Sequence, residues 1–237
     1  MSNKTKIGTI ITQDLPELSS LLAEIGFDFI FIDLEHGQVS DQSIAAIILS
    51  KKNCQVFIRI REISEATIKH ALDLGCDGLI APRLETIQEL TTLVDSSYYP
   101  PIGKRSVGFS LANQFGINFK NYTQQFKPVL LAQIESVQGL SIKEDIISHE
   151  LIDGIFMGPY DLSMSMQLPG EFENEDFKTA VHSVRSTCQK NNKLFGTFST
   201  NVEAAQQEID SGCEFIAIGV DSHIQLMAYQ NIITSVK

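Results

Sequence analysis

The most constraining feature of this sequence is the regular alternation of short apolar runs with segments of helical periodicity. Short apolar runs bounded by turn residues indicate buried strands, and apolar residues at a spacing of three to four indicate helices. Eight runs read as strands, at residues 6–12, 27–33, 55–60, 78–81, 128–133, 152–157, 194–199 and 214–220. Helices are expected at residues 16–25, 41–51, 65–74, 86–94, 138–148, 176–189, 202–211 and 222–236. This alternation predicts a parallel sheet closed into a (β/α)8 barrel.

The length favours one domain. A chain of 237 residues can bury one sizeable core, no linker rich in Pro, Gly or Ser divides it, and residues 1–237 are expected to form a single barrel. An open doubly wound sheet is the competing fold, but it would need a nucleotide loop, and neither G-x-G-x-x-G nor a Walker lysine loop is present. Residues 98–126 interrupt the alternation and predict a long loop or short helices.

Composition excludes several classes of function. A formal net charge of −11 argues against nucleic acid as a partner, because phosphate contacts need clustered Lys and Arg. The N-terminal residues lack the apolar core of a signal peptide and no run approaches a membrane span, so we expect a cytoplasmic protein without membrane association. The four cysteines are scattered without a C-x-x-C pair, and they are expected to be buried thiols rather than disulfides or metal ligands.

Two carboxylates follow two consecutive predicted strands in the central part of the chain. The apolar run before Gln133 is followed by Glu135, and the next run is followed by Asp161. Adjacent parallel strands have their carboxyl ends level, so Glu135 and Asp161 should meet at the same rim. A hard divalent cation between them would relieve their repulsion, as would a shared proton. An alternative with equal support from the sequence is that both residues cap helices on solvent-facing loops.

Further polar residues end the second and third strands. His36 lies three residues beyond Asp33, which makes it a candidate general base, although an exposed loop histidine is the simpler interpretation. Arg59 shares a strand face with Phe57 and should point into the barrel mouth, where it would contact either a ligand or a structural ion-pair partner. Glu35 and Arg61 lie close to these residues in the sequence.

Together these segments resemble the HpcH/HpaI aldolase family, metal-dependent pyruvate aldolases typified by 4-hydroxy-2-oxoheptanedioate aldolase. The resemblance covers nearly the whole chain and rests on an ordered set of motifs: GFDFIFIDLEHG, VFIRIRE, IKHALDLGCDGLIAPRLET, YPPIGKRSVG, AQIES, DGIFMGPYDLS and FIAIGVDS. It implies a TIM barrel of the phosphoenolpyruvate/pyruvate-binding type. It also implies that Glu135 and Asp161 hold a divalent ion, Mg²⁺ or Mn²⁺ and possibly Co²⁺.

The resemblance also implies roles for other residues. Gln133 would contact the 2-oxo acid, and the backbone N–H groups around Tyr160 would receive its carboxylate. His36, oriented by Asp33, would be the base, and Arg59 would stabilise the enolate. The implied reaction is the reversible cleavage of a 4-hydroxy-2-oxo acid to pyruvate and an aldehyde through a metal-stabilised enolate.

Several points stay open in this interpretation. A CoA-thioester lyase of the citrate lyase β or malyl-CoA type shares the fold, but CoA phosphates would favour a basic surface; a non-catalytic barrel scaffold is the third alternative. Ser106 replaces a glycine usual in the family's G-x-R-G-x-G loop, and Glu85 matches a position that often approaches a neighbouring subunit. Family members imply a homo-oligomer, a trimer or hexamer. Residues 98–125 and 163–175 are expected to line the aldehyde end of the pocket.

Overall fold

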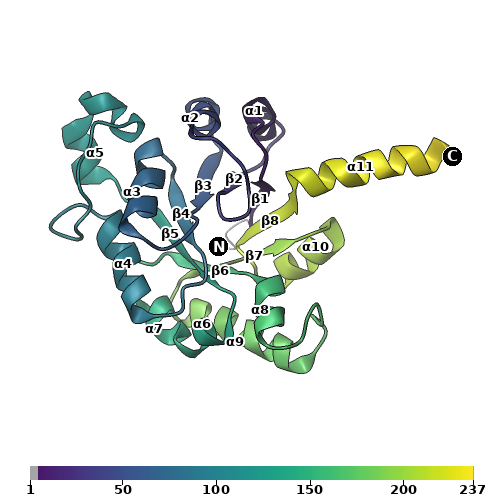
Figure 1. Ribbon diagram of the computed structural model, residues 1–237. Helices are drawn as coiled ribbons and strands as arrows, with labels where there is room; N and C mark the ends of the chain where they lie inside the picture. Colours follow the sequence, from purple (N-terminus) through teal and green to yellow (C-terminus); the bar gives the residue numbers. More distant parts are fainter. Residues whose placement is uncertain (1–4, 237) are drawn as a thin grey trace.

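A computed structural model describes residues 5–236, and its eight strands close into a parallel barrel in chain order (Figure 1). The (β/α)8 prediction is confirmed. The strands are β1 (Lys6–Ile11), β2 (Phe29–Asp33), β3 (Gln55–Arg59), β4 (Gly78–Ala81), β5 (Val129–Ile134), β6 (Gly154–Met157), β7 (Leu194–Ser199) and β8 (Phe215–Val220).

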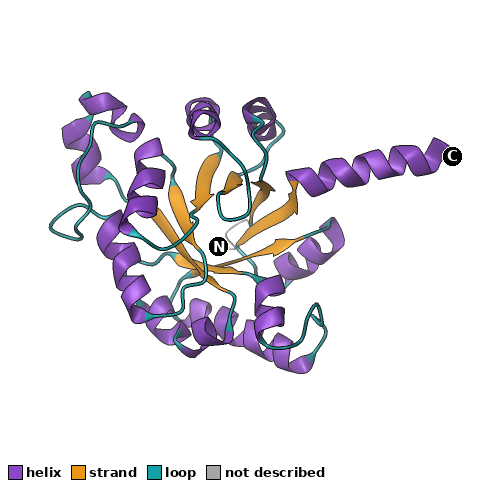
Figure 2. Ribbon diagram, in the orientation of Figure 1, coloured by secondary structure: helices purple, strands orange, loops and turns teal. Residues whose placement is uncertain are grey.

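Helices surround the barrel on its outer side, apart from the C-terminal helix, which points away from it (Figure 2). They are α1 (Pro16–Glu24), α2 (Asp41–Ser50), α3 (Glu65–Leu74), α4 (Ile87–Ser97), the 3₁₀ segment η1 (Leu111–Gly116), α5 (Phe119–Gln125), α6 (Val137–Ser141), α7 (Lys143–Ser148), α8 (Pro159–Ser165), α9 (Glu175–Lys190), α10 (Val202–Asp210) and α11 (Asp221–Val236). Within residues 5–236, no helix has the length and apolar character needed to cross a bilayer.

The strands are apolar on both faces because each face meets a different core. Residues pointing outward join the helices in a large aliphatic cluster, whereas those pointing inward form a smaller cluster rich in phenylalanine. Inside, the rings of Phe29 and Phe215 stack with centroids 3.7 Å apart, and Phe57 meets both rings edge-on. This filled interior leaves the carboxyl ends of the strands as the place where polar side chains can gather.

Two local predictions need correction in this structure. The helix expected at residues 138–148 is two short helices, α6 and α7, because Ile142 leaves helical geometry with φ −114° and ψ 15°. Helix α8 was not among the helices expected from the sequence, yet it follows β6 directly and starts at Pro159. Proline suits a first helical turn, since its missing N–H would have no partner in the helix.

The long segment between α4 and β5 was expected to line the active-site mouth, and within one chain this is wrong. It carries η1 and α5, and it joins the end of a helix to the start of a strand, which places it at the amino-terminal end of the barrel. The Cα of Ala112 accordingly lies 3.4 Å from where a Cβ on Gly75 would stand, at the C-cap of α3. We expected a functional role for this segment because it is long. Its position at the amino-terminal end of the barrel excludes it from the active-site mouth of the same chain.

Helix α11 leaves the barrel instead of packing against it (Figure 1). Only its first turn is firmly held, where Asp221 accepts hydrogen bonds from the Thr12 N–H (3.0 Å), the Thr12 hydroxyl (2.6 Å) and the Gln13 N–H (3.0 Å). Large apolar side chains along its length are exposed: Ile224, Leu226, Met227, Tyr229, Ile232, Ile233 and Val236. A helix that is apolar and exposed in one chain needs another surface to cover it.

Candidate active site

Asp33 and Arg59 form the rigid centre of the site. They are the last residues of β2 and β3 and are direct register partners, so their side chains leave the barrel side by side. The Asp33 carboxylate accepts two hydrogen bonds from Arg59, from Nε at 2.9 Å and from Nη2 at 2.7 Å. The guanidinium also lies 5.4 Å from the centroid of the Phe31 ring. A forked pair of this kind fixes the plane of the arginine.

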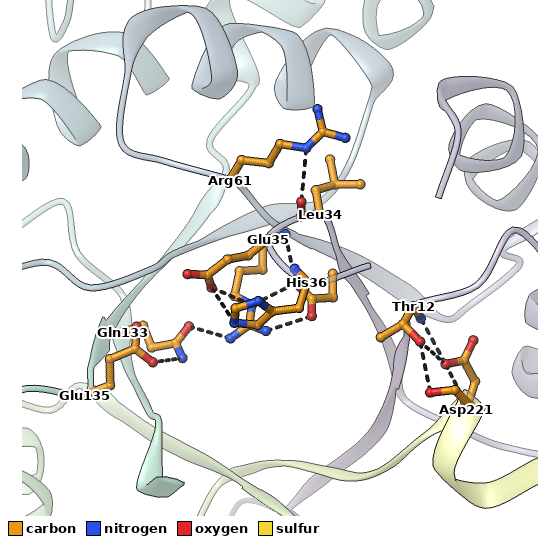
Figure 3. Close-up of polar contacts among 11 residues, drawn as sticks. Thr12, Leu34, Glu35, His36, Arg61, Gln133, Glu135 and Asp221 are labelled. Atoms are coloured by element: carbon orange, nitrogen blue, oxygen red, sulfur yellow. Dashed lines mark hydrogen bonds and ion pairs between the residues drawn. The ribbon is translucent and has the colours of Figure 1, made fainter. Parts of the chain in front are cut away.

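The Glu35 carboxylate lies within 4 Å of both Arg59 and His36, and Figure 3 shows it beside His36. Its Oε2 is 3.2 Å from Arg59 Nε and 3.9 Å from His36 Nε2, and this buried oxygen has no hydrogen-bond partner. His36 is 67% exposed at the mouth. Asp33 contacts His36 through the backbone N–H at 3.3 Å, while its two oxygens bind Arg59. The carboxylate near the imidazole is therefore Glu35, not Asp33 as expected.

Glu135 is held in place from two sides. Its Oε1 accepts a hydrogen bond from the Arg83 N–H at 2.9 Å, and its Oε2 accepts one from the Gln133 amide (Figure 3). Gln133 in turn presents its amide oxygen to Arg59 Nη1 at 3.5 Å. Gln133 and Glu135 are each only 2% exposed. The β5 end is thus linked through one amide to the arginine on β3.

Asp161 lies in the first turn of α8, directly after β6, and β6 pairs with β5. The chain passes close to Glu135 at Gly158, where an added Cβ would lie 2.5 Å from Glu135 Oε2 and 2.9 Å from the Gln133 amide nitrogen. Glycine is required here because a side chain would not fit. Its φ of −96° is one that any residue can adopt. Asp161 and Tyr160 are exposed toward solvent.

The carboxylates of the site perturb one another. Burial raises the pKa of Glu135 to about 7, and the negative charges of Glu35 and Asp161 add to the rise, while Arg59 opposes it. Burial likewise raises the pKa of Glu35 above its usual range, against the opposing charges of Arg59 and His36. Asp161 adds to the rise at both groups. Arg59 is shared between Asp33 and Glu35, so one arginine stands against several carboxylates.

A divalent cation fits this set of groups. Within residues 5–236, no group of three or more His, Cys, Asp and Glu side chains is arranged to hold a metal ion by itself. Glu135 and Asp161 offer oxygen ligands of the type that Mg²⁺ and Mn²⁺ prefer, and a site with two protein ligands leaves positions for water or substrate. The orphaned Glu35 oxygen and the raised pKa of Glu135 are the features that a cation would relieve.

Some residues of the site were not recognised in the sequence. Arg83 contributes only its backbone N–H, at a positive φ of 43°, and no side-chain pattern could reveal that. The sequence placed Glu35 at the end of a strand but gave it no role. Its position next to His36 could have indicated that its carboxylate lies near the imidazole. Gly158 directly precedes the helix-starting proline, and only the packing against Glu135 explains it.

Known proteins of similar sequence are aldolases. A 2-keto-3-deoxy-L-rhamnonate aldolase from Salmonella gallinarum is 31% identical over 224 residues, which cover 92% of this chain and 84% of that protein. A hydroxypyruvate/pyruvate aldolase from Roseobacter denitrificans is 30% identical, with 86% of this chain and 81% of that protein covered. Both alignments cover most of each protein.

Structural comparison points to the same family. A crystal structure of a HpcH/HpaI aldolase/citrate lyase family protein from Burkholderia cenocepacia has a TM-score of 0.92 at 25% identity, covering 99% of this chain and 95% of that one. The citrate synthase SbnG shares the fold, with a TM-score of 0.84 at 23% identity and coverage of 98% and 94%. The sequence profile of the HpcH/HpaI aldolase/citrate lyase family matches residues 7–228. This chain is a member of the HpcH/HpaI aldolase/citrate lyase family.

Proposed function

We propose that this protein is a divalent-metal-dependent aldolase that reversibly cleaves a 4-hydroxy-2-oxo acid to pyruvate and an aldehyde. The observation that carries the proposal is the buried Glu135, which Gln133 and the Arg83 N–H hold in place and whose pKa is raised to about 7 by burial and by the charges of Glu35 and Asp161. Glu135 and Asp161 would hold Mg²⁺ or Mn²⁺, and Co²⁺ is a further candidate because oxygen ligands accept it too. When bound, the ion would supply Lewis-acid chemistry that favours loss of a proton beside the 2-oxo group.

Neighbouring groups would orient Glu135 and stabilise the negative charge that develops on the substrate. Gln133 and the Arg83 N–H fix the Glu135 carboxylate, so its oxygens are oriented before any ligand arrives. Arg59 is locked by Asp33 and faces Gln133, where its guanidinium can stabilise negative charge on the oxygen of the 2-oxo group.

His36 is the proposed base. Its imidazole is exposed at the mouth and lies 3.9 Å from Glu35. In the cleavage direction it would take the proton from the 4-hydroxyl of the substrate, the bond between C3 and C4 would break, and the aldehyde would leave. The electron pair of that bond would remain on the three-carbon fragment as the enolate, and a proton added at C3 would give pyruvate. The N–H groups of the first turn of α8, at Tyr160 and Asp161, have no acceptor within the helix and would receive the substrate carboxylate.

The relatives favour an aldolase over a CoA-thioester lyase. Curated proteins at 30–31% identity are named aldolases, whereas the citrate synthase is similar in fold at 23% identity. A net charge of −11 also disfavours the phosphates of CoA. A scaffold without activity would not require the buried Asp33–Arg59 and Gln133–Glu135 contacts. The cytoplasmic location stays a prediction from the sequence.

Proton exchange at the pyruvate methyl group tests the proposed function. Purified protein is mixed with pyruvate in deuterated water, with and without Mn²⁺ or Mg²⁺, and the methyl signal is followed by NMR. We expect metal-dependent exchange that is lost in Glu135→Gln and Asp161→Asn. Glu150→Gln is the matched control, because Glu150 is exposed on a turn between α7 and β6. Absence of exchange with every divalent metal would refute the proposal.

We also propose that the protein is a homo-oligomer, a trimer or hexamer, in which α11 packs on a second copy. The support is the row of exposed apolar residues along a helix whose hydrogen bonds to the barrel, within residues 5–236, come from its first two residues, Asp221 and Ser222. Light scattering on the size-exclusion peak should give a multiple of the 26.3 kDa chain mass, and Ile233→Glu should lower it. A monomer in the unsubstituted protein would contradict this proposal.

A further inference from the structure

A groove of about 630 Å³ runs between α9 and α10 and opens at the barrel mouth. This volume lies within the range of sites that hold small molecules. Its outer part is lined by polar residues of the two helices, including His182, Gln189 and Gln207. Its inner part is aromatic, and we define this aromatic end by Tyr160, Phe172 and Phe198.

The aromatic end borders the candidate active site at the junction of β6 and α8, since Met157, Pro159 and Tyr160 line the groove. Phe198 lies near the carboxyl end of β7 and packs against the inner barrel cluster. The Tyr160 ring lies 6.2 Å from that of Phe198 and 5.0 Å from that of Phe172. Tyr160 is the neighbour of Asp161, and Gly158 touches Glu135. The rings therefore form a wall that leads from the carboxylates outward into the groove.

The charges of the groove are already balanced. Lys178 pairs with Glu173 at 2.9 Å and with Glu175 at 3.6 Å. Arg185 pairs with Glu208 at 2.5 Å and lies 4.6 Å from the centroid of the Phe195 ring. An anionic group entering the groove would have to break one of these pairs. An uncharged apolar group would instead cover aromatic surface that is open to water, with Tyr160 46% exposed.

From this geometry we infer that the aromatic end binds the side chain of the aldehyde, and that this side chain is an uncharged alkyl or aryl group larger than methyl. The inference rests on the proposed function, because it assigns a substrate class to the same site. Phe172 is then a specificity-determining residue. It lies on the segment between α8 and α9. In this assignment its ring contacts the side chain of the aldehyde and not the reacting carbon.

The test compares aldehydes in the addition direction, using the full-length protein with Mn²⁺ and pyruvate. The aldehydes are acetaldehyde, hexanal and the anionic 4-oxobutanoate. We expect kcat/KM for hexanal to exceed that for acetaldehyde by about tenfold or more, as burial of several methylenes requires. Phe172→Ala should lower the hexanal value about tenfold and leave acetaldehyde and pyruvate methyl exchange unchanged. Phe109→Ala, which removes a ring 76% exposed at the far end of the barrel, is the matched control.

Ala204→Phe provides a second variant, since it fills the groove from α10 instead of removing its wall. It should also lower the hexanal value selectively. Equal values for hexanal and acetaldehyde, a preference for 4-oxobutanoate, or a change of oligomer mass in Phe172→Ala without any aldehyde effect would overturn the inference. The last result would assign the groove to a second copy of the chain.

A readout independent of turnover separates this inference from the proposed function. Saturation-transfer NMR with 1-hexanol should show binding that is lost in Phe172→Ala and kept in Phe109→Ala. If pyruvate exchange fails but this pattern holds, the aldolase proposal is wrong and the apolar site stands. If exchange occurs but 1-hexanol binds equally to both variants, the aldolase proposal stands and the aromatic end is not the binding site.

Discussion

At the residue scale, the site depends on one buried carboxyl group, Glu135, and one largely buried guanidinium, Arg59, held by different partners. Glu135 is restrained by an amide and a backbone N–H and is surrounded by other carboxylates. Arg59 is restrained by a forked contact with Asp33. The first group attracts a cation, and the second presents a positive charge to an oxygen that becomes negative. Each can be tested without disturbing the barrel core.

The pKa of Glu135 predicts how Mn²⁺ binding changes with pH. In the metal-free protein this carboxyl holds its proton up to a pH of about 7, above its ordinary 4.5, and the proton must leave before the ion binds. Apparent affinity should therefore rise by up to about tenfold per pH unit below pH 7 and level off above it. Isothermal titration between pH 5.5 and 8.5 measures this, and a flat profile would contradict the raised pKa.

The same shift predicts the pH dependence of metal-free stability. The unfolded chain releases this proton near pH 4.5, but the folded chain keeps it until about pH 7. The folded state binds more protons in that window, so the free energy of unfolding should fall as pH rises through it. Urea titrations in the presence of a chelator measure the slope, and Glu135→Gln should reduce it.

Arg59→Lys tests the forked contact. Lysine keeps the charge but cannot bind both Asp33 oxygens in one plane, so we expect the rate of pyruvate exchange to fall by about 100-fold or more while Mn²⁺ affinity stays nearly constant. Arg61→Lys is the matched control, since Arg61 is exposed and donates to the Leu34 carbonyl at 3.1 Å (Figure 3). Equal rates in the two variants would show that the fork has no part in the chemistry.

At the element scale, the junction between β6 and α8 passes Glu135 at Gly158 and places Asp161 in the helical turn that follows. The strand ends at Met157, Gly158 passes the Glu135 carboxylate, and Pro159 starts the helix that carries Asp161. The junction works only if no side chain stands at Gly158.

Gly158→Ala should therefore damage the site without unfolding the barrel. Its Cβ would lie 2.5 Å from Glu135 Oε2 and 2.8 Å from the Glu135 Cβ, so the carboxylate must move. We expect Mn²⁺ affinity to fall by about 10- to 100-fold with an unchanged circular dichroism spectrum. Gly108→Ala is the control, because the nearest atom to a Cβ added there, an Asp73 carboxylate oxygen, would be 3.9 Å away. Unchanged affinity in Gly158→Ala would mean that the junction tolerates a side chain.

At the scale of the whole molecule, sequence periodicity was enough to predict the barrel, because each strand is apolar on both faces and each helix on one. The Asp33–Arg59 pairing also followed in part, since both residues end strands and share the inward face with Phe31 and Phe57. The directions that individual segments take in space were harder to predict. The path of α11 away from the barrel and the side reached by residues 98–126 depend on packing that no local pattern encodes.

The thiols report on the integrity of the whole barrel. All four cysteines are buried, and burial raises the pKa of Cys54 and Cys213 to about 11 and that of Cys76 and Cys188 to about 12. We expect alkylation by iodoacetamide at pH 8 to be at least about 100-fold slower than for a free cysteine peptide. In urea all four should react, as counted by mass spectrometry. Rapid modification of one thiol in the folded protein would reveal local opening around that cysteine.

The central claim is that Glu135 and Asp161 together hold one divalent ion, and direct Mn²⁺ binding tests it. Titration followed by electron paramagnetic resonance should give one Mn²⁺ per chain in the unsubstituted protein and in Glu150→Gln. Affinity should drop by about 100-fold in Glu135→Gln and in Asp161→Asn, because each removes a charged oxygen ligand. Equal binding in all four proteins would contradict the account.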